Sequence, residues 1–288
     1  MSAEPTPLTR VLGDLITEWQ LAPAGDLLQT AASLVQPVID ADGVRCAVKV
    51  STADDDNRGE SGTLQVWGGQ GAAELLRADP RRRAVLLEWL DDPLTNQPTD
   101  TALTEVARLY GVLHRPAAPQ LPSLFEAAAR WLTDLEALGR EVPAPPRFVA
   151  QALHAGRELI SGKPTHVIHG DLHDGNVLWR SRTDEWVAID PKGYRGDPAY
   201  EPAPMLWNRW DELGWNPGES IRDRFYALVD EAGLDERRAR DWVVVRAMVN
   251  VSWTVLDARA ERRALSVADH EWVTRNVTLA KAMQDVRP

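Results

Sequence analysis

The amino-acid sequence predicts an α+β protein with two lobes, a small β-rich lobe over residues 1–90 and a larger, mostly helical lobe over residues 91–288. Before residue 90 the apolar residues occur in short runs rich in valine, which is typical of strands. After residue 100 they recur at helical spacing, in stretches separated by proline-rich segments. The polar segment DDPLTNQPTD, residues 91–100, lies between the two patterns. A junction between two lobes is a common place for a ligand cleft.

The small lobe is expected to contain an antiparallel sheet interrupted by one helix. Residues 8–20 place leucines, an isoleucine and Trp19 on one helical face. SLVQPVIDADGVRCAVKV, residues 33–50, predicts two strands joined by a hairpin turn in which Gly43 can take a positive φ. A short helix should follow and end at the glycines of WGGQG, residues 67–71. AAELLRADPRRRAVLLEWL, residues 72–90, predicts a second pair of strands around an Asp-Pro turn.

The larger lobe is expected to be helical apart from a few short strands. Helices are predicted over residues 101–114, 121–139, 147–160 and 239–259. Short strands are predicted on both sides of the polar sequence HGDLHDGN, residues 169–176, and within EWVAID, residues 185–190.

Composition restricts the class of protein. The 288 residues carry a formal net charge of −11, which argues against a nucleic-acid partner, because such a partner requires a basic face. The same charge is compatible with a cationic small substrate. The single cysteine, Cys46, excludes an internal disulfide and a cysteine-based zinc site, and we expect it to be buried. The N-terminus lacks the pattern of a signal peptide and no apolar run approaches the about 20 residues of a membrane helix, so we expect a cytoplasmic protein that uses no membrane.

The sequence HGDLHDGN gathers several ionisable side chains between two apolar runs. His169, Asp171 and His173 alternate, so an extended strand would point all three to one side, as in part of a zinc or di-metal hydrolase site. Such an enzyme needs further histidines, and the six in this chain include no second closely spaced ligand pair. A hydrolase is therefore the weaker interpretation.

A kinase fits the spacing of this region better. Asp171 is followed five residues later by Asn176 and fourteen residues after that by Asp190, which matches a protein-kinase catalytic loop and its metal-binding aspartate. In such a site Asp171 would orient the acceptor hydroxyl and take its proton. The amide oxygen of Asn176 and the carboxylate of Asp190 would hold Mg²⁺ against the nucleotide phosphates. A loop between two short strands can aim all three side chains at one point.

The small lobe supplies candidates for nucleotide binding. A kinase uses a strand lysine, held by a helix glutamate, to bind the α- and β-phosphates. Lys49 lies inside the apolar run AVKV, where a lysine without a partner is uncommon, and Glu60 is the candidate partner. The alternatives are a lysine that reaches solvent from an edge strand and a solvated glutamate. The backbone from Glu88 to Leu90 is expected to bind the adenine edge, although Glu88 and Trp89 could equally pack between the lobes.

HGDLHDGNVL together with IDPKGYRGDPAYEPA, residues 189–203, closely resembles the aminoglycoside phosphotransferase family of kinase-like enzymes. The segment DPKG…GDPAYE, the hairpin at residues 33–50 and the run from WGGQGA to Leu75 and Leu76 are similar to its streptomycin 6-kinase and hydroxyurea kinase branch. The resemblance spans roughly residues 19–260. It implies a two-lobed protein-kinase-like fold and the phosphorylation of a small-molecule hydroxyl with ATP and Mg²⁺.

The same resemblance implies individual roles. Asp171 resembles the catalytic base, Lys49 with Glu60 the phosphate-positioning pair, and Asn176 with Asp190 the magnesium ligands. His169 would be a structural residue of the catalytic loop.

The chain departs from a protein kinase at two points. No G-x-G-x-x-G loop precedes Lys49, so the resemblance implies that Ser33 and neighbouring amides cover the phosphates. Where a protein kinase has Asp-Phe-Gly, this chain has Asp190-Pro191-Lys192-Gly193, in which proline removes one amide donor and Lys192 adds a charge.

Other polar residues near the loop have alternative interpretations. His173 is expected to support the loop by hydrogen bonding, and Asp174 to contact either substrate or solvent. Asp197 is expected to cap a helix near Ala199, unless it or Glu201 supports the catalytic loop or faces the substrate.

The acceptor site is predicted on the helical lobe after Asp190. The chain has twelve tryptophans, and tryptophan faces with carboxylates suit a polyhydroxylated, cationic amine, although each tryptophan alone could belong to the core. The candidates are Trp207, Asn208, Arg209, Trp210, Asp211, Glu212, Asn250, Trp253 and Asp257.

We therefore predict an ATP-dependent kinase for a hydroxyl of a streptomycin-type aminoglycoside or a related compound. The alternatives are a housekeeping sugar or amino-sugar kinase and a nucleotide-binding protein without catalysis. The sequence predicts neither the identity of the acceptor nor the oligomeric state.

Overall fold

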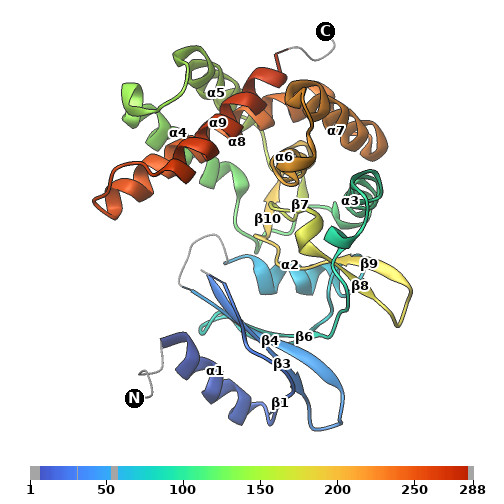
Figure 1. Cartoon of the computed structure of the whole chain (residues 1–288). Coiled ribbons are helices and arrows are strands. Elements are labelled where there is room, and N and C mark those ends of the chain that lie inside the picture. Colours follow the sequence, from blue (N-terminus) through green and yellow to red (C-terminus); the bar gives the residue numbers. More distant parts are fainter. Residues whose placement is uncertain (1–6, 31, 53–57, 285–288) are drawn as a thin grey trace.

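The computed structural model describes residues 7–30, 32–52 and 58–284 (Figure 1). A small lobe built on one sheet lies below a larger helical lobe in this view, so the predicted two-lobed α+β architecture is confirmed.

The sheet of the small lobe is antiparallel, with the strand order β1-β3-β4-β6-β5 and β2 paired to β3. Its turn at Gly43 has a φ of +81°, as the hairpin prediction required. Helix α1 packs on one face of the sheet and α2 lies on the other. The bounds are α1 (Pro7–Glu18), β1 (Ala22–Pro23), β2 (Leu28–Gln29), β3 (Ser33–Ile39), β4 (Arg45–Ser51), α2 (Glu60–Trp67), β5 (Leu75–Asp79) and β6 (Ala84–Glu88).

Alternation along the strands gives the sheet two different faces. Cys46, Val48 and Val50 of β4 are fully buried in a cluster with residues of α1. Lys49 points to the opposite face, where its cross-strand neighbours are Val35 and Val85. An apolar strand thus carries a single lysine toward the larger lobe.

The larger lobe contains the predicted helices, with ends within a few residues of the expected ones, and two small antiparallel sheets, in which β10 pairs with β7 and β8 with β9. The bounds are α3 (Thr99–Leu113), α4 (Leu124–Leu138), α5 (Pro146–Leu159), β7 (His166–Ile168), β8 (Val177–Arg180), β9 (Glu185–Ala188), β10 (Tyr194–Gly196), α6 (Ala203–Trp207), α7 (Pro217–Ala232), α8 (Glu236–Ala260) and α9 (Val267–Ala282).

Helix α2 is anchored to the larger lobe although it precedes residue 90 in the chain. Leu64 and Trp67 belong to the same buried cluster as the helices of the larger lobe, and Trp67 Nε1 donates to the carbonyl oxygen of Leu113 at 2.8 Å. The division of the chain at residue 90 stays a prediction, while this packing fixes the helix that carries Glu60.

Candidate active site

Three predicted residues converge where the lobes meet. Lys49 Nζ donates to Glu60 Oε1 at 2.7 Å and also bonds to the Asp190 carboxylate. Lys49 and Glu60 are only 7% and 4% exposed, which rules out the solvated alternatives for both. Burial would lower the pKa of Lys49, but the carboxylates of Glu60 and Asp190 outweigh it and raise that pKa. Burial would likewise raise the pKa of Asp190, but Lys49 and Lys192 hold it below its usual value.

The loop from Asp190 to Gly193 is shaped by contact with α2. Asp190 has a φ of +55°, a left-handed conformation that is uncommon for residues other than glycine. Gly193 also has a positive φ, and a Cβ there would lie 2.6 Å from the carbonyl oxygen of Gly59. Glycine in the DPKG sequence therefore permits the start of α2 to approach this loop closely.

Both histidines of the catalytic loop bond to its backbone. His169 is fully buried, its Nε2 donates to the carbonyl oxygen of Ile189 at 2.8 Å, and its Nδ1 accepts from the Asp171 amide at 3.2 Å. His173 Nδ1 accepts from the Gly175 amide at 3.0 Å. These bonds match the predicted supporting roles and leave the zinc interpretation without support. In the described part of the chain, no group of three His, Cys, Asp or Glu side chains could hold a metal.

Glu201 also supports this loop. It is fully buried and accepts from the amides of His169 at 2.6 Å and Gly170 at 3.1 Å. Asp197 instead caps the turn that follows, by accepting from the Ala199 amide at 3.0 Å. Asp197 therefore fits the interpretation as a cap, and Glu201 fits the interpretation as a support of the catalytic loop.

The predictions for Asp174 and Arg209 were wrong. Asp174 is 2% exposed and meets neither solvent nor a pocket, because its Oδ2 accepts from Arg209 Nε at 2.5 Å. Arg209 also donates to the carbonyl oxygens of Leu94 and Thr95. Its guanidinium therefore connects parts of the protein and does not bind the acceptor substrate. Burial would raise the pKa of Asp174, but its ion pair with Arg209 opposes this effect, and that pKa is held below its usual value.

Ser33 shares the cleft-facing side of the sheet with Lys49. It lies opposite Ser51, is buried, and its Oγ is 3.0 Å from Thr30 Oγ1. Its contact with phosphates stays a prediction.

At the junction of the lobes, the Glu88 side chain binds residues of the larger lobe. It accepts from Arg180 Nε at 3.0 Å and from Arg182 Nε at 3.0 Å. Leu90 is buried in the core, and the Trp89 ring lies 3.7 Å below the Arg45 guanidinium. The Glu88 side chain thus fits the interlobe alternative, whereas the Trp89 ring contacts Arg45 of β4 in the small lobe. Adenine binding by the backbone from Glu88 to Leu90 stays a prediction.

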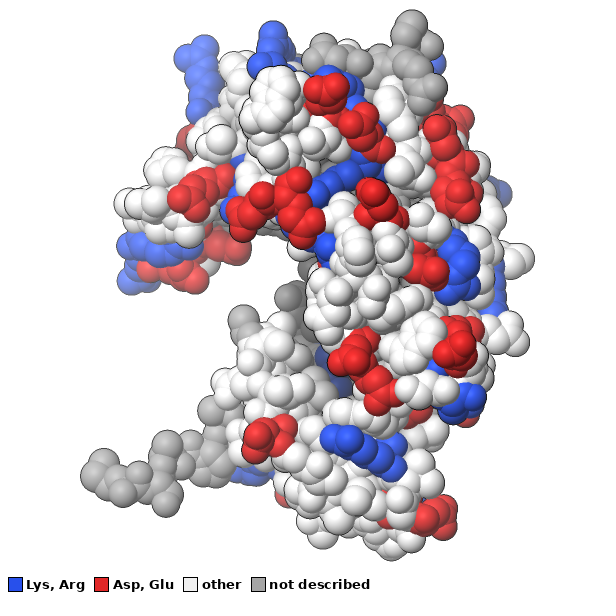
Figure 2. Space-filling model, turned by 45° about the vertical axis from the view of Figure 1, so that its right-hand side comes forward, with Lys and Arg blue, Asp and Glu red and all other residues white. Residues whose placement is uncertain are grey.

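A pocket of about 220 Å³ opens onto Asp171. Beside it, an outer hollow of about 760 Å³ shares Trp131, Tyr194 and Trp253 with the pocket and includes Asp257. A deep hollow between the lobes is visible in Figure 2. The residues that line the inner pocket are Trp131, Gly170, Asp171, Lys192, Tyr194, Tyr200, Trp207, Arg246, Asn250, Trp253 and Trp272.

The predicted acceptor residues divide between this pocket and other places. Trp207, Asn250 and Trp253 line the inner pocket. Asn208 donates to the carbonyl oxygen of Pro204, Trp210 lies below Arg275, Glu212 bonds to Thr99, and Asp211 is exposed. Sequence reasoning missed Trp131 on α4 and Trp272 on α9. It also missed Arg246, although a charge within the apolar run WVVVRAMVN, residues 242–250, is the same signal that pointed to Lys49.

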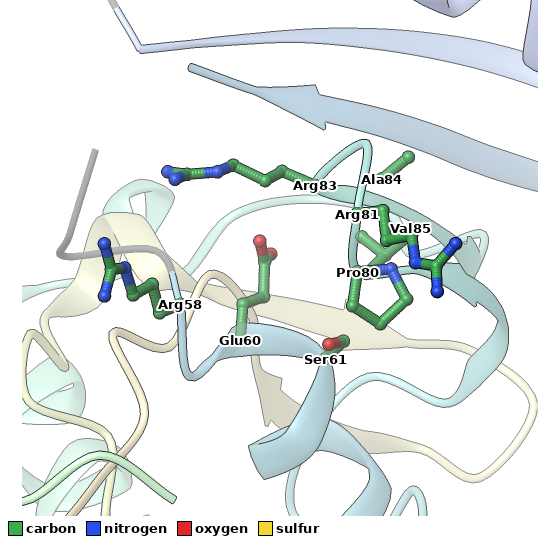
Figure 3. A pocket seen from close by; sticks show the side chains of 8 residues that line it. All are labelled: Arg58, Glu60, Ser61, Pro80, Arg81, Arg83, Ala84 and Val85. Atoms are coloured by element: carbon green, nitrogen blue, oxygen red, sulfur yellow. The ribbon is translucent and has the colours of Figure 1, made fainter. Parts of the chain in front are cut away.

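A third cavity, of about 300 Å³, is lined in part by Glu60 (Figure 3). In Figure 3 the side chains of Arg58 and Arg83 lie near the Glu60 side chain, while the Arg81 side chain points away from it. Its lining residues come from Arg58 and the start of α2, from the turn between β5 and β6, and from the start of β6, rather than from the catalytic loop. The pocket at Asp171 is therefore the one that adjoins the predicted catalytic residues.

Comparison with known proteins decides the family. The model of the aminoglycoside/hydroxyurea antibiotic resistance kinases matches residues 18–258. The chain belongs to this family. The kinase is 35% identical over 270 residues to hydroxyurea phosphotransferase of Kitasatospora aureofaciens, covering 90% of this chain and 77% of the relative. It is 32% identical over 285 residues to streptomycin 6-kinase of Streptomyces glaucescens, covering 96% and 89%. The predicted family and enzyme class, a phosphotransferase, are confirmed.

Solved structures support the kinase fold. Choline kinase LicA from Streptococcus pneumoniae aligns with a TM-score of 0.64 at 12% identity, covering 96% of this kinase and 99% of that chain. A fructosamine-3-kinase homologue from Thermobifida fusca YX-ER1 aligns with a TM-score of 0.59 at 21% identity, covering 98% and 99%. Within the described residues, every helix is too short or too polar to cross a membrane. The cytoplasmic location stays a prediction.

Proposed function

We propose that this kinase transfers the γ-phosphoryl group of ATP to a hydroxyl of an aminoglycoside-like antibiotic or a related small acceptor. The observation that carries the proposal is the cluster of Lys49, Glu60 and Asp190 at the junction of the lobes, with Asp171 lining a pocket on the larger lobe. The relatives named for streptomycin and hydroxyurea favour a drug acceptor over a housekeeping sugar.

Asn176 and Asp190 would hold Mg²⁺. Asn176 Nδ2 donates to the Asp171 carbonyl oxygen at 2.9 Å, which leaves the amide oxygen, Oδ1, as the end available to a cation. The Asp190 carboxylate supplies a second hard oxygen ligand, so the donor set fits this metal. Bound Mg²⁺ would supply charge neutralisation at the phosphates.

Lys49 would bind the α- and β-phosphates while Glu60 holds its ammonium group. Because both side chains are buried, the lysine is fixed before the nucleotide arrives, and positioning is the main source of catalysis in phosphoryl transfer. Ser33 with its neighbouring amides would cover the phosphates, and the backbone from Glu88 to Leu90 would bind adenine.

Asp171 would orient the acceptor hydroxyl and accept its proton as the bond to phosphorus forms. Its own amide bonds to His169, and Glu201 holds the two preceding amides. Buried groups thus fix the position of the loop that carries Asp171. Such fixing favours a catalytic role for Asp171 over the alternative of a protein that only binds nucleotide.

The test is an ADP-release assay with ATP and Mg²⁺ over streptomycin, other aminoglycosides, amino sugars, simple sugars and hydroxyurea. We expect turnover with at least one of the drugs. Asp171→Ala should abolish it while ATP still raises the melting temperature of the variant. Full turnover by Asp171→Ala, or activity confined to simple sugars, would refute the proposal.

A further inference from the structure

Arg180, the last residue of β8, is a buried arginine at the junction of the lobes. The β8–β9 hairpin that carries it belongs to the larger lobe and lies where the two lobes meet (Figure 1). Arg180 is only 3% exposed, so its guanidinium has to find acceptors for five N–H groups within the protein. These acceptors lie outside both the catalytic loop and the inner pocket.

All five donors of Arg180 are used. Nη1 donates to the carbonyl oxygen of Gly69 at 2.9 Å and to Glu185 Oε1 at 2.9 Å. Nη2 donates to the carbonyl oxygen of Ala72 at 2.7 Å and to the Glu88 carboxylate, to which Nε also donates at 3.0 Å. The two carbonyls belong to the turn that follows α2, and Glu88 is the last residue of β6. One side chain of the larger lobe therefore binds two separate segments of the small lobe.

The Glu88 carboxylate has one buried and one exposed cation as partners. Its own side chain is 10% exposed, and its Oε1 also accepts from the Glu74 amide at 2.7 Å. Arg182 donates to Oε2 at 3.0 Å, but the Arg182 side chain is 55% exposed. Exposed ion pairs contribute little, whereas the loss of a buried partner leaves a charge with little access to water. Arg180 is therefore the cation that fixes the Glu88 side chain.

The same hairpin also holds the backbone that follows Glu88. The Asp91 amide donates to the carbonyl oxygen of Trp179 at 2.9 Å, and the Trp179 amide donates to that of Asp92 at 2.9 Å. Trp179 directly precedes Arg180 in β8. Only two residues separate the attachment at Glu88 from the attachment at Asp91, so the hairpin limits how the peptide groups between them can turn.

We propose that Arg180 is a positioning residue for the nucleotide, which holds the backbone from Glu88 to Leu90 in the orientation that binds the adenine edge. A backbone that is fixed in advance loses less conformational freedom when its ligand binds, which strengthens binding. Arg180 acts through Glu88 and touches no reacting atom. The inference rests on the proposed function and adds to it a residue of the larger lobe that sets affinity for the base rather than for the phosphates.

The test is calorimetric titration of the kinase with adenosine and with ATP and Mg²⁺, both without an acceptor. Arg180→Lys keeps the positive charge but places three donors on one nitrogen, so it cannot bind Glu88 and both carbonyls as the planar guanidinium does. We expect this variant to bind adenosine and ATP about tenfold more weakly, by the same factor for both, as loss of a hydrogen bond to a charged group gives. Lys49→Met should weaken the binding of ATP alone, because adenosine has no phosphates.

Two further variants complete the design. Glu88→Gln removes the charge that Arg180 binds and should weaken adenosine binding in the same direction, so it carries the test if Arg180→Lys does not fold. Arg182→Met is the matched control, because it removes an exposed cation from the same carboxylate, and it should change adenosine affinity less than about twofold. In steady-state kinetics Arg180→Lys should raise KM for ATP about tenfold and leave KM for the acceptor unchanged. Thermal unfolding without ligand measures stability separately.

A merely structural role of Arg180 would lower the melting temperature and leave adenosine affinity within about twofold of wild type, which would overturn the inference. An equal loss of affinity in Arg182→Met would also overturn it, and so would a wild-type protein that binds ATP but not adenosine. A wild-type protein that binds both ligands but phosphorylates no acceptor would instead remove the proposed function, while the comparison of variants would still support the role of Arg180.

Discussion

Replacing Asp174 by asparagine removes one charge from a buried ion pair beside the catalytic loop. The side chains of Asp174 and Arg209 are 3% and 11% exposed, so the arginine would keep its charge with little access to water. Loss of one partner from a buried pair costs about 3–5 kcal/mol. Asparagine retains an acceptor oxygen and Arg209 keeps its bonds to Leu94 and Thr95, so we expect the lower end, about 3 kcal/mol. At about 2–4 °C per kcal/mol for a domain of this size, the melting temperature should fall by about 6–12 °C.

The effect of Asp174→Asn should also depend on pH. The folded pKa of Asp174 is held below its unfolded value, because its ion pair with Arg209 opposes the effect of burial. The ion pair therefore stabilises the fold above the unfolded pKa of about 4 and loses its contribution as pH falls through the folded pKa. The gap in melting temperature between wild type and variant should be largest near neutral pH and close in acid.

Circular dichroism during heating, at neutral pH and in a series toward acid, measures both expectations. Asp211→Asn is the matched control, because Asp211 is an exposed carboxylate two residues from Arg209, and such surface changes are usually worth within about 0.5 kcal/mol. Equal melting temperatures for wild type and Asp174→Asn at neutral pH would refute the reasoning, as would an equal loss in the Asp211 control.

Two further predictions concern activity. Lys49→Met should lower kcat about 10²- to 10³-fold and raise KM for ATP, because it removes the phosphate contact and leaves the Glu60 and Asp190 carboxylates without their cation. Steady-state ADP release measures both constants, and a near-normal kcat would exclude the role of Lys49. Glu201→Gln should lower kcat about tenfold at unchanged ATP affinity, because an amide NH₂ replaces one of the oxygens that accept from His169 and Gly170. Steady-state kinetics measures kcat and calorimetric titration measures ATP affinity, and an unchanged kcat would contradict the supporting role.

The parts of the site that follow from sequence are those set by local spacing. Asp171, Asn176 and Asp190 lie within one loop and the hairpin after it, so their separation along the chain already limits where they can point. Lys49 was recognisable because a charge within an apolar strand requires a buried partner, and Glu60 is that partner at 2.7 Å. Hairpins with turn residues such as Gly43 are likewise specified by neighbouring residues.

The acceptor pocket could not be predicted from local spacing, because its walls come from helices that are far apart in the sequence. Trp131 and Trp272 meet Asp171 only after α4, α8 and α9 have packed, and nothing near either tryptophan distinguishes it from a core residue. Asp174 shows the same limit, since its partner Arg209 lies 35 positions away and outside any motif.

Arg246 shows how far the rule that found Lys49 extends. It too is a charge within an apolar run, yet its partners are the carbonyl oxygens of Gly170 and Tyr200 rather than a carboxylate. Searching the sequence for an acidic partner would therefore fail, although the physical requirement, a buried cation with its donors satisfied, is the same. Arg246 lies on α8 and donates to the carbonyl oxygen of Gly170, the residue before Asp171. It therefore connects this helix to the catalytic loop, and it lines the acceptor pocket together with the predicted catalytic residue.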